Sequence, residues 1–139
     1  MGRWSLSRTG SAGYRRYLRT RAWNWRRQRW FRDRRRVGFE PACQVCSRTL
    51  EEAGSLDLHH LSYDGVVELP DGRWQAREAD EDLMPLCREH HGRLHRMMDR
   101  RGEFVGWERR RATVVIVAHL RREWLVRQER ARSCAERKR

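Results

Sequence analysis

The hydrophobic pattern of the first third of the chain predicts one helix. Apolar residues recur among arginines from Tyr14 to about Arg36 with the spacing of a helical face, and Gly38 and Pro41 are expected to end the helix. The second half of the segment carries three tryptophans and a phenylalanine: Trp23, Trp25, Trp30 and Phe31. These rings either anchor the helix on the core or stack on nucleic-acid bases, and anchoring is expected for most of them. Residues 1–13 show no period and are expected to form a loose tail.

The middle of the chain has the pattern of short strands separated by turns. A polar stretch over residues 47–54 predicts a short helix or turn, and residues 55–61 then predict a strand. Residues 66–69 and 73–76 flank a Pro-Asp-Gly turn and therefore predict a hairpin. The acidic run over residues 78–82 is expected to be a loop.

Helices are expected again in the last third of the chain. Pro85 fits the start of a helix over residues 86–99, which Gly102 closes. The stretch TVVIVAHL fits a strand or the start of a buried helix, and His119 within it is expected to be packed in the core. The following RREWLVRQERAR favours a helix. These elements together predict an α+β fold.

Charge divides the chain into three segments. Residues 1–36 carry thirteen arginines and one acidic residue, residues 37–103 carry eight arginines and fourteen acidic residues, and residues 104–139 carry eleven basic and four acidic residues. We expect these segments to be a basic N-terminal arm with its helix, a core unit, and a basic, mainly helical C-terminal extension. The two basic segments favour a polyanion such as nucleic acid as the partner. The alternative is that they form a solvated surface without a partner.

Composition limits the core and the location of the protein. Only 38% of the residues are hydrophobic. The core is therefore expected to be small and to need a bound metal to stabilise it. No stretch approaches the roughly 18 apolar residues of a membrane span, and no signal-peptide core follows the N-terminus. We therefore expect a cytoplasmic, nucleoid-associated protein with no membrane partner. The Arg-rich first 32 residues fit a transit peptide or a DNA-contacting arm.

Two pairs of metal-binding residues lie about forty residues apart. Cys43 and Cys46 form a C-x2-C pair in a tight turn, and Cys87 and His90 form a C-x2-H pair at the start of the predicted helix. Together they supply the four ligands of a Cys3His structural zinc site. A redox pair is the alternative, but the βαβ pattern that accompanies redox motifs is absent. The remaining cysteine, Cys134, is expected to be a free thiol.

The other histidines predict a second cation site. His91 and His95 are four residues apart on the predicted helix, and with His59 at the end of the strand they could hold one cation. Adjacent strand residues point in opposite directions, so His60 avoids the cation and can accept a proton. Hydrolysis of a phosphodiester needs both an activated water and relief of charge on the phosphate. Asp57 shares the face of His59 and either supports a ligand or is a solvated acid.

The motifs CQVC, LDLHHLSYDG and EDLMPLCREHHGRLH resemble those of the HNH endonucleases, which are also called the ββα-metal or His-Me finger superfamily. The resemblance covers residues 37–100 and looks like a bacterial and phage subgroup. It implies a small ββα-metal finger core in which a structural zinc site supports a second, divalent catalytic metal such as Mg²⁺, Mn²⁺, Zn²⁺ or Ni²⁺. His90 stands where the family usually has a fourth cysteine.

The resemblance also implies roles for individual residues. His60 would be the general base, and His59 and His91 would bind the catalytic metal. His95 would be a third ligand or a phosphate contact. Asp82 occupies the position of the family's middle asparagine, where it would either steady the loop that carries the base or approach the metal.

The sequence therefore predicts a metal-dependent endonuclease that hydrolyses DNA, with RNA as the less favoured target. One site would nick a strand, and a double-strand break would need a homodimer or a second event. The alternative is a zinc-stabilised nucleic-acid-binding module without activity, or a subunit of a larger nucleic-acid-processing complex.

Overall fold

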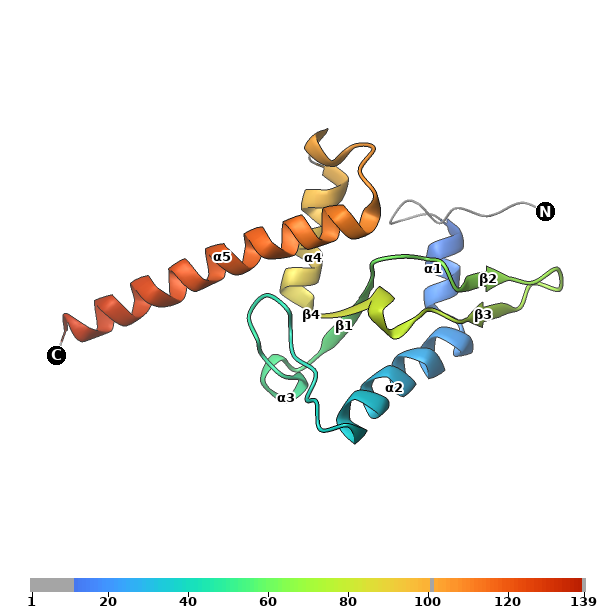
Figure 1. The fold of residues 1–139 in the computed structure, drawn as a ribbon, viewed down its shortest axis with the longest axis horizontal. Helices are drawn as coiled ribbons and strands as arrows, with labels where there is room; N and C mark the ends of the chain where they lie inside the picture. Colours follow the sequence, from blue (N-terminus) through green and yellow to red (C-terminus); the bar gives the residue numbers. More distant parts are fainter. Residues whose placement is uncertain (1–11, 101, 139) are drawn as a thin grey trace.

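The computed structural model describes residues 12–100 and 102–138 and shows an α+β fold (Figure 1). The elements are, in chain order, α1 (Ala12–Leu18), α2 (Arg21–Arg36), α3 (Leu50–Ala53), β1 (Leu56–His60), β2 (Val66–Glu68), β3 (Trp74–Ala76), β4 (Leu83–Cys87), α4 (Arg88–Arg100) and α5 (Arg109–Glu136). Single 3₁₀ turns lie at Asp80–Asp82 and Gly102–Phe104. Most of the tail predicted over residues 1–13 lies outside the described residues.

The single N-terminal helix predicted from the sequence is two helices, α1 and α2. The chain turns at Arg19 and Thr20, and the Thr20 hydroxyl accepts a hydrogen bond from the backbone N–H of Trp23 at 3.2 Å. The same hydroxyl donates to the carbonyl of Tyr17 at 2.7 Å. Threonine favours this break because its side chain satisfies an N–H that the start of a helix leaves without a partner.

The aromatic residues of α2 divide into a buried set and one exposed ring. Trp23, Trp30 and Phe31 are 7%, 3% and 7% exposed and belong to the main core. The prediction that most of these rings anchor the helix is therefore confirmed. Trp25 differs, because 74% of its surface is exposed.

Two antiparallel strand pairs form the β part of the fold. β1 pairs with β4, with Leu56 opposite Cys87 and His60 opposite Leu83. β2 and β3 form the hairpin predicted around the Pro-Asp-Gly turn, with Val66 opposite Ala76. In Figure 1, α4 and α2 lie on opposite sides of the β1–β4 pair.

The prediction that a helix starts at Pro85 is wrong, because Pro85 lies inside β4 and α4 begins at Arg88. The Pro85 carbonyl accepts a hydrogen bond from the backbone N–H of Gln44 at 3.1 Å. A strand residue directs its N–H and C=O to the same side, so the nitrogen of Pro85 also faces Gln44 rather than β1. The missing N–H therefore costs the β1–β4 pair no hydrogen bond.

The ambiguous stretch at residues 113–120 is helical and forms part of the first half of α5. Thr113, Ile116, Val117 and Leu120 are buried along one face of this helix, and the helix then extends away from the rest of the molecule (Figure 1). Although α5 is long, its apolar residues are interrupted by charged ones. No helix within residues 12–100 and 102–138 has the length and apolar character needed to cross a membrane.

Candidate metal centres

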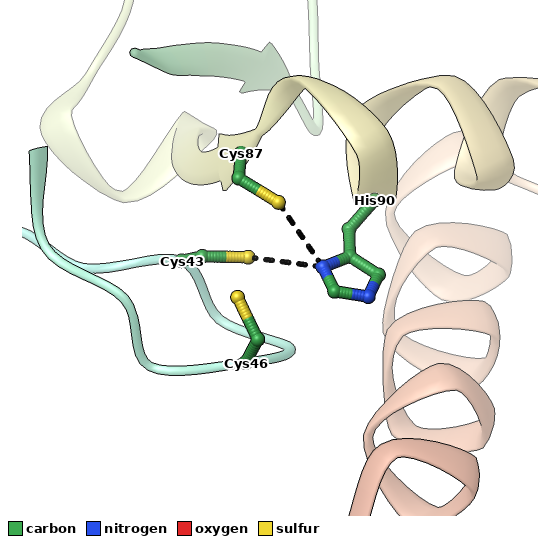
Figure 2. A group of neighbouring side chains, drawn as sticks. All are labelled: Cys43, Cys46, Cys87 and His90. Carbon is green, nitrogen blue, oxygen red and sulfur yellow. Dashed lines mark hydrogen bonds between the residues drawn. The ribbon is translucent and has the colours of Figure 1, made fainter. Parts of the chain in front are cut away.

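The first centre is a cluster of four buried side chains, which we call the Cys3His cluster: Cys43, Cys46, Cys87 and His90. Figure 2 shows the two cysteines of the turn facing the cysteine and histidine at the β4–α4 junction. One ligand atom from each residue lies within 4.8 Å of all the others. The Nδ1 atom of His90 is 3.1 Å from the Cys87 sulfur and 3.7 Å from the Cys43 sulfur.

Local backbone structure brings the two halves of the Cys3His cluster together. The N–H of Cys43 donates to the carbonyl of Arg48 at 2.9 Å, and the N–H of Ser47 donates to the carbonyl of Cys43 at 2.8 Å. These bonds close the turn that carries the first pair. The bond between Gln44 and Pro85 joins this turn to β4, whose last residue is Cys87.

The chemistry of the Cys3His cluster suits a bound metal ion. Burial raises the pKa of the Cys43 thiol to about 11. Burial acts in the same direction at Cys46, but hydrogen bonds from Arg48 outweigh it and lower the pKa of that thiol below its ordinary value. The Arg48 Nε atom lies 3.2 Å from the Cys46 sulfur. Burial also lowers the pKa of His90 and so favours the neutral ring. Thiolates and neutral imidazoles are the forms that bind metals, and three thiols with one imidazole match the ligands of structural zinc.

The second centre, which we call the histidine cluster, consists of His59, His91 and His95. Their ligand atoms also lie within 4.8 Å of one another. The ring centroids of His59 and His91 are 5.4 Å apart, and those of His91 and His95 are 4.5 Å apart. The Nε2 atoms of His91 and His95 are separated by 2.9 Å. One strand and two successive turns of α4 therefore direct three imidazoles to one point.

Neighbouring residues hold the rings of the histidine cluster. The Oδ2 atom of Asp57 lies 3.1 Å from Nδ1 of His91, which leaves Nε2 of that ring for a metal. Asp57 therefore supports a histidine of the cluster and is not merely a solvated acid. The histidine that it contacts is His91, although the sequence placed Asp57 on the face of His59. The Thr113 hydroxyl of α5 lies 3.0 Å from Nε2 of His59.

Burial differs across the histidine cluster. His59 is 1% exposed, and burial lowers its pKa well below the ordinary value. Burial also lowers the pKa of His95 to about 3. The side chains of His91 and His95 are each 18% exposed. The cluster is therefore closed on the β1 side and open along α4.

His60 lies on the opposite face of β1, as the alternation of strand residues predicts. Its ring is fully buried and stacks on Tyr63, with 5.1 Å between ring centroids. Its Nε2 atom lies 3.0 Å from Oε1 of Glu78. Burial lowers the pKa of His60, and Glu78 opposes this effect. Within the described residues the other ring nitrogen, Nδ1, has no hydrogen-bond partner.

Glu78 is a central residue that sequence reasoning missed. It is 3% exposed, and its Oε1 atom accepts hydrogen bonds from the Tyr17 hydroxyl and from His60. The Nη2 atom of Arg26 donates to the Glu78 backbone carbonyl at 2.7 Å. The residue therefore connects α1, α2 and β1. No sequence signal distinguishes Glu78 from the other acidic residues of the 78–82 run.

Replacing Glu78 with alanine is expected to lower the free energy of unfolding by about 3 kcal/mol. The change leaves the donors of Tyr17 and His60 buried without an acceptor. Urea unfolding followed by circular dichroism measures the loss. Glu81→Ala is the control, since it removes an exposed carboxylate of the same run. Equal stability of the two variants would contradict the proposed importance of the buried network.

Asp82 does not join the histidine cluster. Its carboxylate binds the guanidinium of Arg110 in α5. Its backbone carbonyl accepts a hydrogen bond from the N–H of Leu61 at 2.8 Å. Since Leu61 follows His60 directly, this bond ties down the chain immediately after the paired histidines.

The two clusters meet on α4, where the consecutive residues His90 and His91 belong to different clusters. Every residue that the sequence assigned to a zinc or cation site lies in one of these two groups. Comparisons of the chain with protein-family models, curated proteins and solved structures found no match.

Proposed function

We propose that this protein is a metal-dependent endonuclease that hydrolyses phosphodiester bonds of DNA at the histidine cluster. The Cys3His cluster is its structural zinc site. The observation that carries the proposal is the convergence of three imidazoles beside a separate, fully buried Cys3His cluster. The histidine cluster is separate from the residues of the Cys3His cluster and therefore offers a site for a second ion.

The arrangement of elements around the histidine cluster supports the HNH resemblance. An antiparallel pair, β1 and β4, leads directly into α4, and the ligands come from the end of β1 and from α4. A ββα-metal finger requires this order of two strands and a helix. The Cys3His cluster sits at the β4–α4 junction, where it fixes the start of the helix that carries His91.

The residues of the histidine cluster have separate tasks in the proposed reaction. A divalent cation, when bound, would reduce the charge on the phosphate and assist the ionisation of water. Asp57 orients His91 through Nδ1, and Thr113 contacts His59. His91 and His95 line the open side, so the phosphate approaches along α4.

His60 is the proposed general base, and Glu78 prepares it for that role. By accepting a hydrogen bond from Nε2–H, Glu78 selects the tautomer with its lone pair on Nδ1. Because the ring is fully buried on the face of β1 opposite the histidine cluster, the proposed role requires a change at the end of β1 that brings Nδ1 within hydrogen-bond reach of a water at that cluster. The burial of His60 also favours a second candidate function, a zinc-stabilised nucleic-acid-binding module in which His60 only supports the fold.

Arginine-rich helices support DNA as the partner. α2 contains eight arginines and a single acidic residue, Asp33. Arginine side chains on such a helix bind phosphates with little dependence on sequence.

The test is nicking of a supercoiled plasmid in Mg²⁺, Mn²⁺, Zn²⁺ or Ni²⁺. The native chain is expected to nick, and His60→Ala is expected to nick about 100-fold more slowly, which is the usual contribution of a general base. Circular dichroism establishes that the variant is folded. If both chains nick equally, His60 is not the base. If the native chain binds DNA but nicks in none of the metals, the binding module is correct.

A further inference from the structure

Trp25 is an exposed aromatic ring with no partner inside the described part of the chain. The structure describes six tryptophans, and five of them contact another ring or an arginine: Trp23, Trp30, Trp74, Trp107 and Trp124. Trp25 makes neither kind of contact with the described residues, and it is 74% exposed. The core therefore makes no use of this ring.

The surroundings of Trp25 are basic. Arg21 and Arg29 lie one helical turn before and after it on α2, and neither has a carboxylate of the described chain within ion-pair distance. Gln28 and Arg32 lie on the same side of the helix. A groove of about 340 Å³ runs beside the ring, and its lining residues are Ala22, Trp25, Arg26, Gln28, Arg29, Arg32 and Ala76.

We propose that this face of α2 binds an unpaired base of a nucleic-acid strand. Trp25 is the stacking platform, and Arg21 and Arg29 bind the phosphates on either side. An aromatic ring between cations is the combination that binds single strands, because every base presents a π-face. The inference rests on the proposed function only in taking nucleic acid as the partner.

Charge and composition favour a nucleic acid over a protein partner at this face. A protein docking surface centres on several apolar side chains that become buried together. The residues three and four positions from Trp25 are Arg21, Ala22, Gln28 and Arg29, so no second large apolar side chain adjoins it on the helix. The single large ring of Trp25 can stack on one base, and the arginines around it can bind the phosphates on either side of that base.

The position of Trp25 separates this face from the histidine cluster. α2 packs on the side of β1 that carries His60, and the histidine cluster lies on the opposite side with α4 (Figure 1). A strand held at Trp25 is therefore a different segment from the one presented to the histidine cluster.

The test compares Trp25→Leu with Trp25→Phe, because leucine keeps an apolar side chain and phenylalanine keeps a ring. Affinity is measured by fluorescence anisotropy of a labelled oligothymidine of about 15 nucleotides, a length within the range of single-strand sites, and of a duplex of equal length, without added divalent cation. Trp25→Leu is expected to weaken single-strand binding about tenfold. The affinity of Trp25→Phe for the single strand is expected to change by less than about threefold, and so is the affinity of Trp25→Leu for the duplex.

The inference would be overturned if the native chain did not bind the single strand, or if Trp25→Leu bound it as tightly as the native chain does. It would also be overturned if Trp25→Leu and Trp25→Phe lost the same affinity, or if Trp25→Leu lost the same affinity for the single strand and for the duplex. A native chain that binds the oligonucleotide in this pattern but cuts no plasmid would contradict the proposed nuclease and leave this binding face standing. Thermal unfolding of both variants checks that their stability matches the native chain.

Discussion

Cys87→Ser is expected to release the ion from the Cys3His cluster and to lower the free energy of unfolding by more than about 4 kcal/mol. For a chain of this size the loss corresponds to a fall of about 15 °C in the midpoint of thermal unfolding. The reason is that Cys87 joins β4 to α4 and holds both against the turn that carries Cys43 and Cys46. Elemental analysis of the purified protein and calorimetry measure the two effects.

Cys134→Ser is the matched control for this experiment. Cys134 is an exposed free thiol on α5, so its loss should change neither metal content nor stability. A zinc chelator adds a second control: it should destabilise the native chain but have little further effect on Cys87→Ser. A Cys87→Ser chain with the same metal content and unfolding temperature as the native chain would contradict a metal in the Cys3His cluster.

His91→Ala is expected to slow plasmid nicking on the order of 10³-fold, because a catalytic metal contributes several kcal/mol to the transition state. His91 is the proposed ligand at the centre of the histidine cluster. Its Nε2 atom lies 2.9 Å from that of His95, and its Nδ1 atom lies 3.1 Å from Oδ2 of Asp57. Initial rates of nicking measure the effect. Zinc in the Cys3His cluster should remain, since His90 is unchanged.

His119→Ala is the control for the loss of a histidine. His119 lies on α5, where its Nε2 atom is 3.0 Å from Glu123 and its side chain is 42% exposed. Its removal should leave both the nicking rate and the metal content unchanged. If His91→Ala nicks at the native rate in every metal, the histidine cluster is not the site of hydrolysis.

The residues of the two clusters were predictable because their spacing reflects local geometry. A C-x2-C pair fits one turn, and ligands three or four residues apart share one face of a helix. His91 and His95 therefore had to point the same way once α4 formed, and Cys87 at the end of β4 lies beside His90 in the first turn of the helix. The opposite directions of His59 and His60 follow from the alternation of strand residues.

Other features depend on contacts between distant segments, which sequence pattern does not reveal. The contact between Thr113 and His59 exists only because α5 packs on β1, and the burial of Glu78 exists only because α1 and α2 cover it. Pro85 fits a strand because its nitrogen faces Gln44 and not β1. His119 was expected in the core, but the turn of α5 places it beside Glu123 at the surface.

Because neighbouring residues of α4 serve different clusters, the two ions would load in a fixed order. An ion on the cysteines and His90 would secure the first turn of the helix that presents His91 to His59. A cell starved of zinc would thus disable the second cluster while every one of its ligands stayed intact.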